Sequence, residues 1–228
     1  MSAELILSTL LSPIVLFFVL GLGAALMRSQ MTVPQSFAKG LAIYLMMAIG
    51  LKGGVEMSKT ALTPDVFGIA AVALLLSFAT PFLAYMMLRV TSKLSRVDAA
   101  ATAGHYGSIS IVTFVAATQA LQLAGIVTSG YMVAMAALME VPAIMSALIL
   151  ARHGMKKSGE VAGSEKGELF REVFLNASVV VLVGALVIGW VTGERGMEKI
   201  SPFFVTPFQG VLCLFLLDMG LNAGRGLR

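Results

Sequence analysis

Long apolar stretches recur along the whole sequence, and they constrain the fold more than any other feature. A hydrocarbon core about 30 Å thick is crossed by roughly 20 apolar residues of helix. Seven stretches reach that length, at residues 11–29, 36–55, 65–90, 98–124, 129–151, 173–193 and 204–224. The sequence therefore predicts an all-α, polytopic membrane helix bundle with seven visible spans.

The composition agrees with lipid as the solvent and argues against several other classes of protein. Of the 228 residues, 58% are hydrophobic and 12% are charged, whereas about 25% of the residues in soluble domains are charged. The net charge of +4 comes from short basic clusters between apolar runs, so nucleic-acid binding is not indicated. A single cysteine, Cys213, excludes an intrachain disulfide and a multi-cysteine metal site.

Lys and Arg residues are unevenly shared between the two sets of connecting segments. If the N-terminus lies outside, the inner segments hold 12 of these residues and the outer segments hold 4. Basic residues are enriched in cytoplasmic segments of membrane proteins. We therefore expect the N-terminus outside, and the charged linker at 152–172 in the cytoplasm.

Two of the apolar stretches resemble each other, which indicates an internal repeat. The segment from Gly40 to Gly54 aligns, at an offset of 170, with the segment from Gly210 to Gly224. Glycines coincide at three positions; the alternative is chance similarity between two apolar helices. A repeat of five spans, an odd number, would place its two copies in opposite directions, as in many secondary transporters.

This repeat would divide the chain into 1–151, the first five-helix repeat, 152–172, the linker, and 173–228, the first two helices of a second repeat. Three further spans would complete the second copy, so we expect a truncated product or a fragment. Pairs of small residues at four-residue spacing, which allow close helix approach, occur in both copies: Gly21/Ala25, Gly50/Gly54, Ala185/Gly189 and Gly220/Gly224.

A polar run interrupts the fourth stretch between Ala103 and Thr113. Polar groups deep in a bilayer are costly, and a helix unwound there would expose backbone groups that can hold a small ion. The alternative is a continuous helix whose hydroxyl groups bond to their own backbone. The candidate residues of this run are Gly104, His105, Gly107, Ser108, Ser110 and Thr113.

Two carboxylates also fall inside apolar stretches. Glu140 lies near the centre of the fifth stretch, two residues before Pro142. We interpret it as a cation ligand or as a group that holds the broken fourth helix; a protonated, hydrogen-bonded carboxyl group is the alternative. Asp218, in the last stretch, could line a pathway, form a subunit contact or reach toward the interface. For His105, an ordinary hydrogen-bonding role is the alternative to a role as ligand or proton handler.

Four segments together resemble the sodium-dependent bicarbonate permease (SbtA-like) family. They are Gly-Leu-Lys-Gly-Gly at 50–54, Arg-Val-Asp-Ala-Ala-Ala-Thr-Ala-Gly-His-Tyr-Gly-Ser-Ile-Ser at 96–110, Met-Glu-Val-Pro-Ala at 139–143 and Leu-Asp-Met-Gly-Leu at 217–221. The resemblance implies ten spans in two inverted repeats, with sodium and bicarbonate bound where two broken helices cross. It also implies a bacterial plasma membrane, a homotrimer and a PII-like regulatory protein on the cytoplasmic side.

By this resemblance, the substrate-binding residues are Gly107, Ser108, Ser110 and Thr113. Gly104, His105, Glu140 and Asp218 remain candidates for ion binding or support. Ile111 and Val112 interrupt a run that is richer in serine and glycine in the family. The predicted partners are thus bicarbonate, sodium as the coupling ion and membrane lipid, without a further metal or an organic cofactor.

The leading functional prediction is a sodium-coupled bicarbonate importer, a secondary active symporter without enzymatic activity. The alternatives are a carrier of another small carboxylate anion and an inactive fragment. An intramembrane enzyme is disfavoured because the sequence shows no nucleophile–base pair; its centre would have to combine His105 with Ser108 or Ser110.

Overall fold

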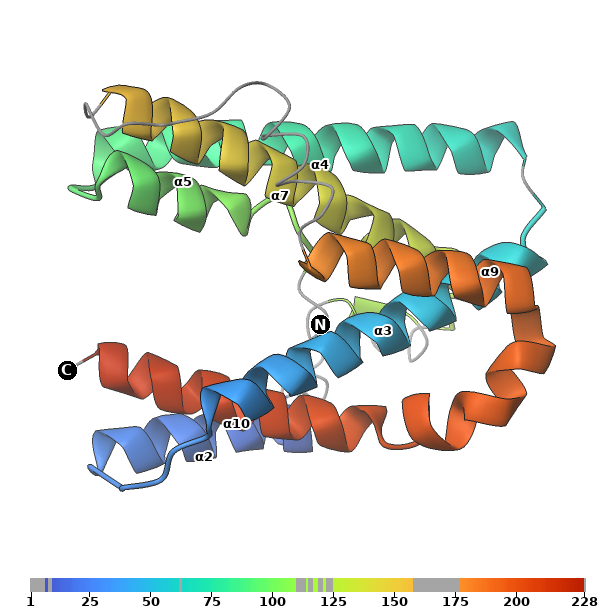
Figure 1. Ribbon diagram of the computed structural model, residues 1–228, viewed down its shortest axis with the longest axis horizontal. Coiled ribbons are helices and arrows are strands. Elements are labelled where there is room, and N and C mark those ends of the chain that lie inside the picture. Colours follow the sequence, from blue (N-terminus) through green and yellow to red (C-terminus); the bar gives the residue numbers. More distant parts are fainter. Residues whose placement is uncertain are drawn as a thin grey trace. The chain divides into compact units, whose positions relative to one another are not determined.

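The chain forms helices over the parts that the computed structural model describes, namely residues 7, 10–61, 63–109, 114, 117, 118, 121, 125–157 and 177–227. Seven helices are found there, and these residues contain no strand (Figure 1). They are α2 (Pro13–Leu26), α3 (Gln35–Lys59), α4 (Pro64–Thr91), α5 (Arg96–Gly104), α7 (Met132–Lys157), α9 (Ala177–Phe204) and α10 (Phe208–Gly226).

Four of these helices are long and apolar enough to cross a membrane: α3, α4, α7 over Met132–Gly154, and α9. Helix α2 is apolar but has 14 residues. The all-α prediction is therefore confirmed for the described residues, while the ten-span inverted repeat, the division at 151 and 172, and the orientation stay predictions.

Local sequence signals explain several of the helix ends. Proline occupies the first position of α2 (Pro13) and of α4 (Pro64), where its missing N–H has no intrahelical partner to lose. Ser95 caps α5: its hydroxyl accepts a hydrogen bond from the Asp98 N–H at 3.1 Å and donates one to the Asp98 carboxylate at 2.6 Å.

Two helices end differently from the predicted stretches. Helix α9 extends to Phe204, beyond the predicted end at 193, but its backbone leaves the helical region at Gly193 (φ 57°, ψ −154°). Helix α5 ends at Gly104, and residues 105–109 form a turn; Ser110 and Thr113 lie outside the described residues. Helix α7 stays helical through Pro142.

The helices belong to two compact units, which share α3 and α9. One unit contains α2, residues 35–48 of α3, residues 194–204 of α9, and α10. Within it, α2 and α10 lie side by side (Figure 1). An added Cβ at Gly21 would overlap the Leu217 carbonyl oxygen, and one at Gly220 would overlap the Phe18 carbonyl oxygen. Glycine is required because the two backbones meet there.

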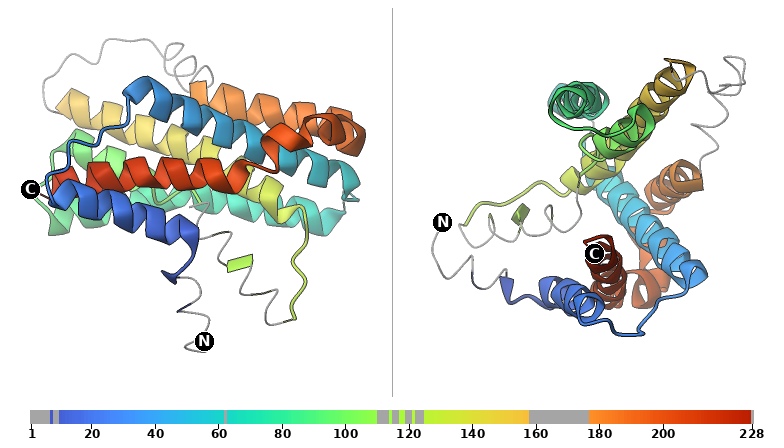
Figure 2. Two further views of the ribbon diagram at one scale, coloured as in Figure 1. Left: turned by 90° about the horizontal axis from the view of Figure 1, so that it is seen from below. Right: turned by 90° about the vertical axis from the view of Figure 1, so that its left-hand side faces the viewer.

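The second unit contains residues 49–59 of α3, residues 177–193 of α9, and helices α4, α5 and α7. Helices α4, α5 and α7 pack against one another in both views of Figure 2. Helices α3 and α9 meet through glycines: an added Cβ at Gly54 would overlap the Leu186 carbonyl oxygen, and one at Gly189 would overlap that of Leu51.

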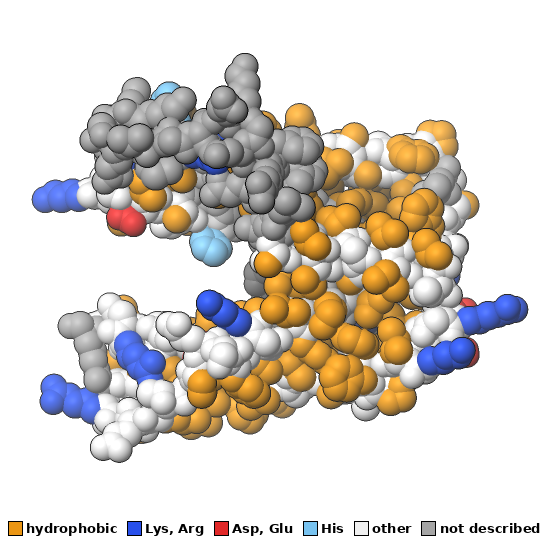
Figure 3. Space-filling model, in the orientation of Figure 1, with side chains coloured by type: hydrophobic (Ala, Val, Ile, Leu, Met, Phe, Trp, Pro, Cys, Tyr) orange, Lys and Arg blue, Asp and Glu red, His pale blue; other side chains and the backbone are white. Residues whose placement is uncertain are grey.

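The outer faces of the helices are apolar. On α4, Leu75 is 66% exposed and Val90 is 83% exposed, while Ser77, Pro81 and Ala84 form the buried stripe. Figure 3 shows hydrophobic side chains over most of the described surface on the visible face. This distribution, apolar outside with a small-residue and polar stripe inside, is the one that lipid favours.

Candidate functional site

The candidate site begins where α5 ends. After Gly104, the N–H groups of His105, Tyr106 and Gly107 donate to carbonyl groups three residues earlier, at 3.3, 3.0 and 3.2 Å. This tight turn replaces the regular helical ladder. The polar run therefore lies, from residue 105 to residue 109, outside regular helix.

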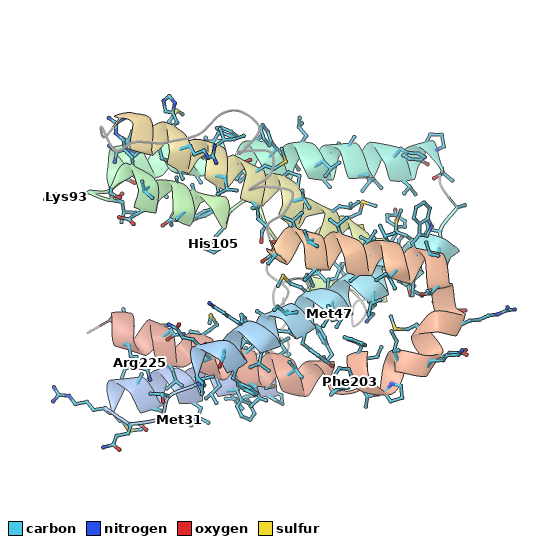
Figure 4. All side chains as sticks on the ribbon, in the orientation of Figure 1. Met31, Met47, Lys93, His105, Phe203 and Arg225 are labelled. Atoms are coloured by element: carbon cyan, nitrogen blue, oxygen red, sulfur yellow. The ribbon has the colours of Figure 1, made fainter. Side chains whose placement is uncertain are left out.

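A hydrogen bond joins this turn to α7. The Ser108 hydroxyl donates to the Glu140 carboxylate at 3.0 Å, across 32 residues of sequence. Both side chains are half-buried. The exposed side chain of His105, three residues before Ser108, projects from the end of α5 in Figure 4. The structure thus joins two features that the sequence analysis treated separately, the polar run and the carboxylate of the fifth apolar stretch.

The two glycines of this region let neighbouring helices approach. A Cβ added to Gly107, which is buried, would overlap the Ser77 carbonyl oxygen and come within 2.7 Å of Pro81 Cγ and 2.9 Å of Ala143 Cβ. A Cβ added to Gly104 would lie 2.6 Å from the Ala147 side chain. The turn is therefore enclosed by α4 on one side and α7 on the other.

Two serines that the sequence analysis missed connect α4 with α7 beside the turn. The Ser77 hydroxyl donates to the Met139 carbonyl oxygen. The Ser146 hydroxyl lies 2.8 Å from the carbonyl oxygens of both Phe78 and Pro142. Both serines are fully buried. One sequence signal could have indicated Ser77: it lies four residues before Pro81. Because proline has no N–H, the Ser77 carbonyl group lacks its regular helical hydrogen bond.

Asp218 lies in the other unit, on α10. It is 5% exposed, and the Asn222 amide donates to its carboxylate at 3.2 Å. The structure therefore brings together Gly104, His105, Gly107, Ser108 and Glu140, and it gives Asp218 a partner on its own helix.

The oxygen atoms at the turn are hydroxyl, carboxylate and backbone carbonyl groups, which suit small hard cations better than transition metals. Over the described residues, no group of three or more His, Cys, Asp or Glu side chains is arranged to hold a metal ion. A monovalent cation held by such oxygens, together with a small anion, is the chemistry that this arrangement permits.

Residues 13–228 match the family model of the Na+-dependent bicarbonate transporter superfamily. The chain belongs to this superfamily. No curated protein shows a significant match to it. Membership makes the chain a membrane transport protein, in agreement with its membrane-length apolar helices. It also identifies sodium and bicarbonate as the ion and the substrate associated with the superfamily.

Proposed function

We propose that the chain is a sodium-coupled bicarbonate importer, and that the turn at residues 105–109 is part of its ion and substrate site. The observation that carries this proposal is the hydrogen bond from Ser108 to Glu140 at the end of a helix that stops inside an apolar stretch. A carboxylate and an unwound backbone in lipid are costly, so their combination points to ligand binding.

The negative charges of Glu140 and of bicarbonate explain why bicarbonate transport would be coupled to sodium. Bicarbonate near the Glu140 carboxylate is repelled, because like charges a few Å apart in a site of low dielectric constant interact strongly. A sodium ion at Glu140 and the Ser108 hydroxyl would cancel that repulsion. In this mechanism Gly107, Ser108, Ser110 and Thr113 contact the anion, and His105 and Gly104 support the ion site.

The wider architecture is part of the proposal. A broken fourth helix at the bilayer midplane, two inverted five-helix repeats, an outside N-terminus in a bacterial plasma membrane, a homotrimer and a PII-like regulator all follow from the sequence and the resemblance. The similar glycine contacts of the α2–α10 and α3–α9 pairs support the repeat. Asp218 is proposed as a support for that architecture.

The test is uptake of [14C]bicarbonate by cells that express the gene, with sodium or with choline as the external cation. We expect uptake that requires sodium. Glu140→Gln keeps a hydrogen-bond acceptor for Ser108 but removes the charge, so the half-saturating sodium concentration should rise at least about tenfold, equivalent to about 1.4 kcal/mol of lost cation binding. Uptake that is absent, or equal in choline, would refute the proposal.

Glu56→Gln is the matched control. Glu56 lies in the same unit and pairs with Lys59 at 3.2 Å, so its substitution should leave the sodium dependence unchanged. Competition by formate and acetate, measured in the same assay, separates bicarbonate from other small carboxylates. Stronger inhibition by either acid than by unlabelled bicarbonate would assign the chain to that other anion class.

A further inference from the structure

We propose that Ser77 is a positioning residue that holds the 105–109 turn in register with Glu140. This inference rests on the proposed function of the turn. Ser77 lies in the middle of α4, is fully buried and belongs to neither segment that forms the Ser108–Glu140 hydrogen bond.

Ser77 contacts two residues beside the Ser108–Glu140 hydrogen bond: Met139, just before Glu140, and Gly107, just before Ser108. Its hydroxyl donates to the carbonyl oxygen of Met139, which precedes Glu140. Its carbonyl oxygen faces Gly107, which precedes Ser108, so closely that a Cβ on Gly107 would overlap it. One residue of α4 therefore fixes the backbone on both sides of the Ser108–Glu140 bond.

The second step concerns Pro81, four residues after Ser77. Because proline has no N–H, it cannot donate the regular helical hydrogen bond to the Ser77 carbonyl oxygen. The ring of Pro81 is fully buried and lies against Gly107 as well. Pro81 thus leaves this carbonyl group directed at the turn, where the Gly107 Cα can approach it as a weak donor.

The third step is a comparison with Ser146, which offers a matched control. Ser146 is also fully buried and also connects α4 with α7, through the Phe78 carbonyl oxygen. Its contacts lie on α4 and α7 alone, whereas those of Ser77 include the turn. Ser77→Ala and Ser146→Ala each remove one buried hydroxyl hydrogen bond and keep the backbone carbonyl groups. Only the Ser77 hydroxyl bonds Met139, the residue before Glu140, so only Ser77→Ala should displace Glu140 and loosen the turn that Ser108 joins to it.

The experiment combines two measurements on the full chain with Ser77→Ala and Ser146→Ala. The first is backbone amide hydrogen exchange of the segment 105–109, followed by mass spectrometry in detergent, which does not depend on transport. The second is sodium-dependent [14C]bicarbonate uptake in cells, analysed as half-saturating concentrations and maximal rate.

For Ser77→Ala we expect exchange in segment 105–109 to become about fivefold faster and both half-saturating concentrations to rise about fivefold, the equivalent of one buried hydrogen bond. The maximal rate per folded molecule should change less than about twofold, because the binding groups remain present. Ser146→Ala should leave exchange at 105–109 and both half-saturating concentrations within about twofold of the unsubstituted chain.

Unchanged exchange in Ser77→Ala, or equal acceleration in Ser146→Ala, would overturn the proposal. If Ser77→Ala yields no folded protein, Pro81→Ala replaces it: the new N–H competes for the Ser77 carbonyl oxygen, and exchange at 105–109 should again accelerate. If exchange behaves as expected while uptake ignores sodium, the positioning role stands and the proposed function fails.

Discussion

The α2–α10 pair and the α3–α9 pair use the same contact in reversed order. In α2–α10 the level at which both helices contribute a glycine, Gly21 and Gly220, comes first along both helices, and Ala25 with Gly224 follows four residues later. In α3–α9 the Ala185–Gly50 contact comes first, and the level with a glycine on each helix, Gly54 and Gly189, follows.

The pairs also correspond residue by residue. An offset of 170 relates α3 to α10, and an offset of 164 relates the carbonyl groups of Phe18 and Leu22 on α2 to those of Leu182 and Leu186 on α9. The two pairs therefore share contacts as well as composition, which supports the proposed repeat.

The pairs differ beyond these contacts. Position 218 on α10 carries a buried aspartate, where α3 has Ala48, which is 5% exposed. Helix α2 ends near Arg28 (φ 62°), whereas α9 continues as helix after Gly193 (φ 57°). The α2–α10 pair thus contains a buried carboxylate that the α3–α9 pair lacks, and the α3–α9 pair contains a kink where α2 ends in a loop.

The largest expected effect lies at the levels where both helices contribute a glycine. Gly220→Ala and Gly54→Ala place a methyl group on a carbonyl oxygen of the partner helix, so each should lower the free energy of unfolding by about 3 kcal/mol. Thermal unfolding in detergent measures this loss. Gly210→Ala and Gly40→Ala, on the same helices but with open space around them, should be neutral or stabilising.

The next effect concerns the kink at Gly193, which α9 contains and α2 does not. Gly193 adopts φ 57° and ψ −154°, a conformation restricted almost entirely to glycine, so Gly193→Ala should cost about 2 kcal/mol. The same unfolding assay applies, with Gly184→Ala on the same helix as control. Equal stability of the two variants would mean that α9 does not require the kink.

A smaller effect is expected at the Ala–Gly contacts. A Cβ on Gly50 would lie 2.6 Å from the Leu182 carbonyl oxygen, and one on Gly224 would lie 2.7 Å from the Ala25 methyl group. Gly50→Ala and Gly224→Ala should each cost about 1 kcal/mol. If these variants are less stable than Gly54→Ala and Gly220→Ala, the correspondence between the pairs is broken.

The smallest effect is expected at Asp218. Asp218→Asn keeps the size of the side chain and an acceptor for Asn222, so stability should change by less than about 1 kcal/mol. Asp218→Ala, which copies Ala48, should also fold. A loss of more than 3 kcal/mol in unfolding measurements on Asp218→Ala would show that α10 depends on its carboxylate and that the two pairs are not interchangeable there.

Much of the fold could be predicted because a helix that crosses lipid requires a long apolar stretch, which is visible in the sequence. The apolar stretches at 36–55, 65–90 and 129–151 correspond to α3, α4 and α7 within a few residues at most ends. The predicted stretch ends at 193, but α9 resumes after the kink at Gly193 and includes Pro202, although glycine and proline usually interrupt helices. A kink and a terminus look alike in sequence.

The candidate site was predicted in part for a similar reason. Ser108 and Glu140 are conspicuous because polar groups are rare in apolar stretches, and the structure joins them. Ser77 and Pro81 were missed because serine and proline are common in membrane helices. Their importance comes from the packing of α4 on the turn, about thirty residues away in sequence, which no local pattern encodes.

The interlocked backbones at Gly21, Gly220, Gly54 and Gly189 restrict how this molecule can move. At these four positions the partner backbone leaves no space for a side chain, so we expect neither pair to act as a sliding joint. We therefore expect each pair to move as one stiff piece. The bending has to be taken up elsewhere, and Gly193 is where α9 already departs from the helix.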